Sequence, residues 1–404
     1  MRTTLTERYE MNLERFQNSP AGHIVQAVHR GSTYLAFVPN PLPPLLELDA
    51  ALWRSLSTAD RALGELAGLG RTLPNPQLLI NPFMRREAVL SSRIEGTQAG
   101  IADLYAYEAS QLALPGFDET TPASDVQEVL NYVHALEYAL EEIKRLPVSL
   151  RLLRNMHGRL MEGVRGAHST AGEFRRIPNL IGHPGATLQN ARYVPPPVPE
   201  MIAALDALEK YLHTQREEDY PPLVRLALIH YQFEAIHPFE DGNGRSGRLL
   251  ISLLLVNWGL LPAPLLYLSA FFERYRATYY DLLFAVSERG AWREWVLFFL
   301  QGVSDQAADA IARAKHLQDL REGWRAQLLQ GRASATALHL LDTLFVAPVI
   351  TTRGAQEILG VTYPAAKANI QKLVQAGILA PGQRAANGQT YIADAVLKIL
   401  REEP

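Results

Sequence analysis

Apolar residues recur at intervals of three and four positions along most of the chain from Val126 onward. This spacing gathers them on one face of an α-helix. It predicts helices at residues 126–146, 150–164, 201–214, 222–236, 273–288 and 292–320. A further run, at 249–261, is apolar on every side, which is typical of a helix buried at the centre of a bundle. The pattern therefore predicts a mainly α-helical fold.

The segment before this region has a different pattern. It contains a proline-rich passage at residues 38–49, and residues 82–114 show helical spacing that predicts one or two helices. A polar stretch of turn-forming residues follows at 115–125. Such a stretch marks a boundary between structural segments, so we expect an N-terminal helical region over residues 1–115.

One segment inside the helical region predicts β-structure instead. Residues 172–197 contain strand-like pieces around the turn-forming sequence His183-Pro184-Gly185 and end in three prolines. This order predicts a β-hairpin flap over Phe174–Tyr193. The free edge of such a hairpin would pair with an extended segment of a target protein, or the hairpin would only cover the core.

The last part of the chain, residues 333–404, is expected to form a small domain of its own after a central domain over 116–332. Its pattern predicts three short helices and then a hairpin with an Asn-Gly turn. These elements are expected at residues 337–346, 351–360, 362–379 and 380–393. Helix, turn, helix and hairpin in this order are typical of a winged helix-turn-helix domain.

That C-terminal domain raises the question of DNA binding. Its candidate recognition helix carries only Lys367 and Lys372, and residues 331–404 hold seven basic and five acidic side chains. Most DNA-reading domains are more basic than this. Protein docking or self-association, for example as a homodimer, is therefore favoured over DNA.

Composition narrows the class of protein further. The chain has 404 residues, a net charge of -3 and no cysteine, which excludes disulfides and thiolate metal sites. The N-terminus lacks the apolar run of a signal peptide. The longest apolar block, Leu249–Val256, is shorter than the roughly 18 residues that a membrane span needs. The sequence therefore predicts a cytoplasmic globular protein.

The densest group of reactive side chains is the segment IHPFEDGNGRSGRLL, residues 236–250. Its glycines match G-x-G-x-x-G, but a dinucleotide site needs a preceding strand and a later acid, and here a helix precedes the glycines. A P-loop requires lysine and then Ser or Thr at the positions of Arg248 and Leu249. The pattern therefore disfavours both of these nucleotide sites.

A metal-hydrolase site would use His230, Glu234, His237 and Asp241. Only His230 and Glu234 share a helix face, and the chain has no HExxH motif. His230 is therefore better interpreted as a core or interface histidine than as a metal ligand.

An anion site at the start of a helix accounts best for the segment. Gly242 and Gly244 let the backbone approach a phosphate, and the N–H groups of the first helical turn would point at it. Arg245 and Arg248 are three residues apart, so their guanidinium groups would reach the same side of a helix. Two arginines beside a helix N-terminus favour a polyphosphate over a single carboxylate.

Two further side chains fit this interpretation. Asp241 would repel the anion unless a divalent cation bridges them, so it predicts Mg²⁺. His237 would lie at the edge of the phosphate site, where a group that titrates near neutral pH suits a general base.

Residues 237–248, HPFEDGNGRSGR, resemble the signature of the Fic family, H-P-F-x-[D/E]-G-N-G-R-x-x-R, at every defined position. The resemblance covers roughly residues 80–300 and implies a Fic-type helical bundle. Family members mostly transfer AMP from ATP to a hydroxyl side chain of a target protein. The resemblance therefore implies a protein adenylyltransferase that uses ATP and Mg²⁺.

The resemblance also implies a role for each residue of the motif. His237 would deprotonate the target hydroxyl, and Asp241 would hold Mg²⁺ against the phosphates. Asn243 and the glycine amides would stabilise the α-phosphate, and the two arginines would hold the distal phosphates. The implied nucleotide-binding residues are Gly242, Asn243, Gly244, Arg245, Ser246, Gly247 and Arg248. Phe239 is more typical of a structural anchor, and Tyr280 corresponds to a nucleotide-contacting tyrosine of relatives or belongs to the core.

A second motif lies far upstream, in SSRIEGT, residues 91–97. It resembles the family's inhibitory motif, [S/T]-x-x-x-E-[G/N], with Ser91, Glu95 and Gly96 in place. A glutamate that reaches the nucleotide pocket would pair with Arg248 and compete with the γ-phosphate for it. The resemblance therefore implies auto-inhibition by an N-terminal helix, whereas a solvated helix glutamate would have no such effect.

Two alternatives stay open at this stage. The chain could be a DNA-binding regulator whose Fic core serves as a sensor or scaffold. It could also keep the fold but change the chemistry, using another nucleotide or removing AMP with a water that Glu95 positions.

Overall fold

The computed structural model describes residues 13–72, 76–111, 123–164, 170–214, 220–385 and 388–401. Its described residues form mainly helices, as the sequence predicts, and divide into two compact units. Unit 1 comprises residues up to 63, 134–259 and 271–304, and unit 2 comprises 64–133, 260–270 and 305 onward. Helices α2, α5, α10 and α12 contribute residues to both units. The predicted segment boundary near residue 115 lies outside the described residues.

Unit 1 is built around helix α8 (Pro222–Ile236), which ends where the sequence predicts. Nearly every side chain of α8 is buried, and the helix contacts α7, α9, α11 and strand β2. The helices that unit 1 draws on are α1 (Leu13–Phe16), α2 (Ala50–Thr72), α5 (Ala123–Glu142), α6 (Leu150–Leu160), α7 (Val198–His213), α9 (Asn243–Asn257), α10 (Ser269–Arg274), α11 (Arg276–Arg289) and α12 (Trp292–Gln330). Residues 249–257 of the all-apolar stretch predicted at 249–261 form the second half of α9, and the leucines of that half are buried, whereas residues 258–261 lie beyond the end of the helix.

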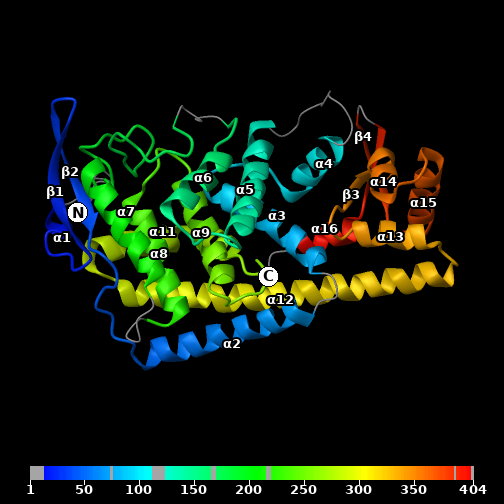
Figure 1. Cartoon of the computed structure of the whole chain (residues 1–404), viewed down its shortest axis with the longest axis horizontal. Helices are drawn as coiled ribbons and strands as arrows, with labels where there is room; N and C mark the ends of the chain where they lie inside the picture. Colours follow the sequence, from blue (N-terminus) through cyan, green and yellow to red (C-terminus); the bar gives the residue numbers. More distant parts are fainter. Residues whose placement is uncertain are drawn as a thin grey trace, which may run out of the picture. The chain divides into compact units, whose positions relative to one another are not determined.

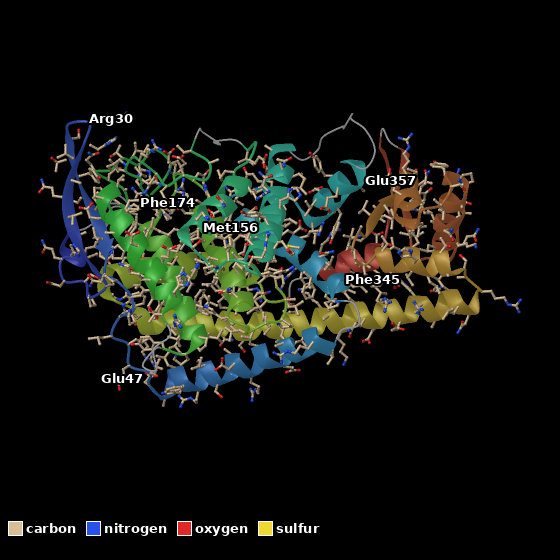
Figure 2. The ribbon with its side chains drawn as sticks, in the orientation of Figure 1. Arg30, Glu47, Met156, Phe174, Phe345 and Glu357 are labelled. Carbon is tan, nitrogen blue, oxygen red and sulfur yellow. The ribbon has the colours of Figure 1, made fainter. Side chains whose placement is uncertain are left out.

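An N-terminal β-hairpin is present that the sequence analysis does not predict. Strands β1 (Gly22–His29) and β2 (Ser32–Pro39) pair antiparallel over their full length. Figure 2 shows Arg30 at the hairpin turn, where Arg30 and Gly31 both have positive φ angles. Such angles are typical of a two-residue type I′ turn.

The segment predicted as a β-hairpin flap, Phe174–Tyr193, is not a hairpin. Its only strand-like pairing in the structure is a single bridge between Ile181 and Tyr193. Pro178 and Pro184 lack the N–H group that a strand ladder requires, and the Asn190 side chain holds a turn by accepting the N–H of Thr187. The segment, labelled at Phe174 in Figure 2, is therefore a loop closed at one bridge, and we call it the 174–193 loop.

Unit 2 contains the helices and hairpin predicted for the C-terminal region. Helices α13 to α15 appear together with β3 and β4 in Figure 1. The three strands β3, β4 and β5 pair in the order β3-β5-β4. Strand β3 and helix α16 are additions to the prediction, and the Asn-Gly turn lies partly outside the described residues. The bounds are α3 (Gln77–Ile94), α4 (Ile101–Gln111), α13 (Ala335–Thr343), α14 (Thr352–Leu359), α15 (Tyr363–Gln375), α16 (Asp394–Arg401), β3 (Val349–Thr351), β4 (Ala380–Ala385) and β5 (Gly388–Ile392).

A helix that crosses a lipid bilayer must be both long and apolar. Among the described helices, none combines the length and the apolar character that crossing a membrane requires.

Candidate active site

The segment of clustered polar residues that begins at His237 lies in unit 1, in the loop between α8 and α9 and the start of α9. Helix α8 ends because His237 adopts the left-handed conformation, with φ 51° and ψ 62°. The residue before a proline is disfavoured in the right-handed helical region, and Pro238 follows directly. The turn thus places the His237 side chain at the very end of α8.

The ring of His237 has a defined hydrogen-bonding direction. Its Nδ1 lies 3.3 Å from the carbonyl oxygen of Glu234. A carbonyl only accepts, so Nδ1 carries the proton in this contact, and Nε2 is then the unprotonated nitrogen of the neutral ring. His237 is half-buried, so the ring meets both protein and solvent. This is the tautomer that a general base acting through Nε2 requires.

The main chain around His237 is held by hydrogen bonds to its carbonyl groups. Every carbonyl oxygen from Ile236 to Gly242 accepts a hydrogen bond. The donors are the side chains of His157, Arg175, Asn179 and Asn243 and the main-chain N–H groups of Arg175 and Ser246. The α8–α9 loop is therefore fixed from two sides, by His157 of α6 and by Arg175 and Asn179 of the 174–193 loop.

His157 on α6 is one of these braces, and the sequence analysis does not single it out. Its Nδ1 accepts the N–H of Gly172 at 3.0 Å, so its Nε2 donates to the carbonyl of Asp241 at 2.9 Å. The ring also stacks on Phe239, with centroids 3.7 Å apart and planes 3° from parallel. Burial lowers the pKa of His157 to about 4, so the ring is neutral at physiological pH.

Asn243 contacts the loop rather than an open surface. Its Oδ1 accepts the N–H of Phe239 and its Nδ2 donates to the carbonyl of the same residue, both at 2.8 Å. Phe239 is buried, as expected of a structural anchor. The side chain implied to stabilise the α-phosphate is thus occupied in bracing the loop, which leaves the backbone N–H of Asn243 as its contribution at the helix start.

Helix α9 begins at a glycine that the local geometry requires. Gly242, the N-cap residue, has φ 74°, and a Cβ there would lie 2.9 Å from Sδ of Met161 and 3.3 Å from Nε2 of His157. Because glycine has no side chain, no capping side chain covers the first turn of α9. The first-turn N–H groups of a helix have no intrahelical acceptors, so this end of α9 suits an anion.

Three charged side chains surround the start of α9. Arg245 is buried, with Nη2 3.7 Å from Sδ of Met161 and 4.0 Å from Oδ1 of Asp241. Arg248 is also buried, and its charge contributes to lowering the pKa of His230. Asp241 is the exposed member, with 61% of its side chain accessible and Oδ1 accepting the N–H of Gly242 at 2.6 Å.

Two residues of the motif, Gly247 and Ser246, have contacts with the protein itself in the structure. Gly247 packs against α8, since a Cβ at Gly247 would lie 2.4 Å from Oε1 of Glu234 and 3.2 Å from the Phe233 ring. Ser246 is fully buried and its N–H is bonded inside α9 to the carbonyl of Gly242. Gly247 therefore permits the close approach of two helices, and a nucleotide role for either residue stays a prediction.

His230 and Tyr280 both lie close to Tyr279. His230 is buried, in contact with Tyr279 at 2.8 Å, and stacks with Phe272 and Trp295, which supports its interpretation as a core histidine. Tyr280, next to Tyr279 on α11, is half-buried. Its nucleotide contact also stays a prediction.

The inhibitory motif lies in unit 2, at the end of α3. Ser91 is buried within the helix, and Glu95 is its exposed C-cap residue. Gly96 follows with φ 107°, an angle that favours glycine. The local geometry thus explains the glycine, and the inhibitory role stays a prediction.

The metal prediction concerns Asp241. Among the described residues, no group of three or more histidine or acidic side chains forms a metal cage. Mg²⁺ is commonly held by one or two carboxylates together with substrate phosphates and water rather than by an all-protein cage. A single exposed carboxylate next to an anion site fits a metal that arrives with its nucleotide.

Comparison with protein families gives two adjoining matches. Residues 53–141 match the Fic/DOC family N-terminal domain, and residues 147–255 match the Fic/DOC family domain. The second match contains the whole α8–α9 loop. The chain therefore contains the Fic/DOC family N-terminal and Fic domains.

Individual relatives agree with these matches. The chain is 27% identical over 207 residues to proteins named "Protein adenylyltransferase Fic" from Drosophila grimshawi and Aedes aegypti, covering 51% of this chain. The match spans only 38% and 37% of those two proteins. A Fic family protein from Desulfovibrio desulfuricans G20 has the same fold, with a TM-score of 0.55 and 19% identity over 87% of this chain and 98% of that one.

Proposed function

We propose that the protein is an adenylyltransferase that transfers AMP from ATP to a hydroxyl side chain of a target protein. The observation that carries the proposal is the geometry at the α8–α9 loop. An imidazole whose Nδ1 contacts the carbonyl of Glu234 lies on a fully braced main chain, before a helix N-terminus flanked by two buried arginines. The name of the relatives, protein adenylyltransferase, supports the same reaction.

The reaction that fits is an in-line displacement at the α-phosphorus of ATP. The target hydroxyl oxygen forms a bond to the α-phosphorus as the bond to the pyrophosphate oxygen breaks. Nε2 of His237 takes the proton of the hydroxyl, and pyrophosphate leaves. The first-turn N–H groups of α9 and the guanidinium of Arg245 stabilise the phosphate charge, so catalysis rests on positioning and electrostatics.

Asp241 is the proposed Mg²⁺ ligand. The metal, when bound with ATP, neutralises phosphate charge and makes pyrophosphate a better leaving group. The carboxylate is already oriented, because Gly242 donates to its Oδ1. The second oxygen is the one proposed to face the metal.

The proposed enzyme is auto-inhibited through Glu95. The proposal is supported by the match of Ser91, Glu95 and Gly96 to the inhibitory motif and by charge, since a carboxylate competes with the γ-phosphate for Arg248. A charge-assisted pair is worth about 1.5–3 kcal/mol, which corresponds to roughly a 10- to 150-fold change in the competent population.

Two surfaces are proposed to receive macromolecular partners. The target segment docks along the 174–193 loop, where Ile177 and Ile181 are exposed. We propose a winged-helix domain for α13 to α15 with β4 and β5, used for protein docking or for a homodimer rather than for DNA.

Glu95→Gly tests the function and its regulation together. Wild type and Glu95→Gly are incubated with saturating Mg²⁺-ATP, and AMP attached to protein is mapped by mass spectrometry. We expect a 10- to 150-fold gain in auto-modification for Glu95→Gly, and a return to low activity for Glu95→Gly/Arg248→Ala. Equal modification of wild type and Glu95→Gly would rule out inhibition by Glu95, and absence of AMP from both would contradict the proposed reaction.

A further inference from the structure

Arg175, which lies before the 174–193 loop's bridge, has an unusual set of partners. The residue is 1% exposed, and its guanidinium donates to main-chain carbonyls. The distances are 2.8 Å from Nε to His237, 2.6 Å and 3.4 Å from Nη2 to Pro196 and Ile236, and 3.2 Å from Nη1 to Ile177. Its own N–H donates to the carbonyl of Pro238 at 2.9 Å.

These contacts indicate that Arg175 is a buried cation whose role is geometric. Burying a charge costs free energy unless hydrogen bonds replace its lost hydration, and burial lowers the pKa of Arg175 to about 10. The planar guanidinium fixes several acceptors in set directions at once, which the single ammonium of lysine does not do.

One of the residues that Arg175 holds, His237, is under backbone strain. His237 has φ 51°, and a left-handed conformation costs a non-glycine residue about 1–2 kcal/mol. Arg175 bonds the carbonyl of His237 through Nε and the next carbonyl, that of Pro238, through its main chain. The same guanidinium reaches Ile177 at the start of the 174–193 loop.

We infer that Arg175 is the positioning residue that holds the main chain of His237 in its reactive conformation and fixes it relative to the 174–193 loop. This inference rests on the proposed function. Because the loop is the proposed docking site of the target, one side chain sets both the base and the segment that presents the hydroxyl. Displacing a catalytic group by about 1 Å reduces rates by roughly 10²-fold.

The test compares Arg175 with its neighbour. Arg175→Lys and Arg175→Met are made in the Glu95→Gly background. Arg176→Met, at an exposed arginine that forms an ion pair with Glu173, is the control for hydrogen exchange, and Arg151→Met, at an exposed arginine of α6, is the control for activity. We expect kcat per ATP-binding site to fall about 10²-fold for Met and about 10-fold for Lys, with the Kd for Mg²⁺-ATP unchanged. Arg151→Met should retain the kcat of its parent.

A purely structural role predicts a different result, in which the fraction of ATP-binding protein falls but kcat per binding site does not, and that result would overturn the inference. Hydrogen exchange gives a readout that does not need activity. Arg175→Lys should raise exchange of the amides in residues 237–242 about tenfold or more, with Arg176→Met unchanged. An inactive Glu95→Gly parent would refute the proposed function alone, whereas unchanged exchange in Arg175→Lys would overturn the positioning role.

Discussion

At the scale of single residues, the site depends on two backbone positions that tolerate little change. His237 and Gly242 both adopt left-handed conformations, at either end of the loop between α8 and α9. The first directs the imidazole, and the second lets the chain turn beneath Met161 and His157. Chemistry at this site is therefore set by main-chain geometry as much as by the reactive side chains.

Gly242→Ala should separate crowding from backbone strain. The added Cβ would lie 2.9 Å from Met161 Sδ, at a φ of 74°. Gly163→Ala is the control, because Gly163 has φ 67° but no heavy atom within 4 Å of its Cβ position. Strain alone costs about 1–2 kcal/mol, so we expect Gly242→Ala to lower the free energy of unfolding by more than Gly163→Ala in urea titrations. Equal losses would show that the contacts at Gly242 do not matter.

Asp241 carries the metal prediction at this scale. We expect EDTA to abolish AMP transfer by Glu95→Gly and added Mg²⁺ to restore it, because the metal completes the phosphate site. Thermal unfolding followed by circular dichroism should be the same with and without EDTA, since the metal enters with the nucleotide. Transfer that persists in EDTA would show that the Asp241 assignment is wrong.

At the scale of elements, the sequence predicts the helices of the core well and the strands poorly. Helix α8 is predicted at its observed ends because Pro222 starts it and Pro238 prevents its continuation. The hairpin β1–β2 was missed although its residues alternate, because its Arg30-Gly31 turn lacks the usual Asn-Gly signal. The 174–193 loop was predicted as a hairpin because its apolar residues mimic strands, while its prolines remove the ladder donors.

The residues of the candidate site likewise divide into those that the sequence predicts and those that it does not. The motif from His237 to Arg248 is local in sequence, so its chemistry could be predicted before the structure was known. His157 and Arg175 could not, because they lie far from the motif along the chain and only the fold brings them to the carbonyls of Asp241 and His237. Nothing in the pair Arg175-Arg176 indicates which arginine is buried.

The packing of α8 on α11 makes a prediction about pH. Burial, with the charge of Arg248, lowers the pKa of His230 to about 3 from an ordinary value of 6.5. Below pH 6.5 the His230 imidazole binds a proton in the unfolded chain but not in the folded chain, so the free energy of unfolding falls as the pH drops toward 3. Between pH 7 and pH 5 this amounts to about 2 kcal/mol.

His230→Phe provides the comparison. Phenylalanine keeps a ring next to Phe272 and Trp295 but does not titrate, so the variant should lose about 2 kcal/mol less stability than wild type between pH 7 and pH 5. Urea titrations at both pH values measure this difference. His23→Gln, at an exposed histidine, is the control and should follow wild type. A His230→Phe protein with the full wild-type pH dependence would contradict the assignment.

At the scale of the whole molecule, the proposed reaction site lies in unit 1 and the proposed regulatory helix lies in unit 2. The loop between α8 and α9 holds the proposed base and the proposed anion site, and Glu95 of the proposed inhibitory motif lies at the end of α3. The N-terminal Fic/DOC match covers α3 and the Fic match covers the reaction site. The proposed regulation and the proposed catalysis thus rest on separate elements of one chain, so we expect Glu95 variants to change activity without altering the reaction site.

The central claim, transfer of AMP by His237, is tested most directly by following the two ends of ATP. Glu95→Gly is incubated with Mg²⁺ and ATP labelled at either the α- or the γ-phosphorus, and label retained on protein is measured. The account predicts that α-label is retained, γ-label is not, and His237→Ala loses the α-label by about 10²- to 10⁴-fold while still binding ATP. Retention of γ-label, or unchanged α-label in His237→Ala, would contradict it.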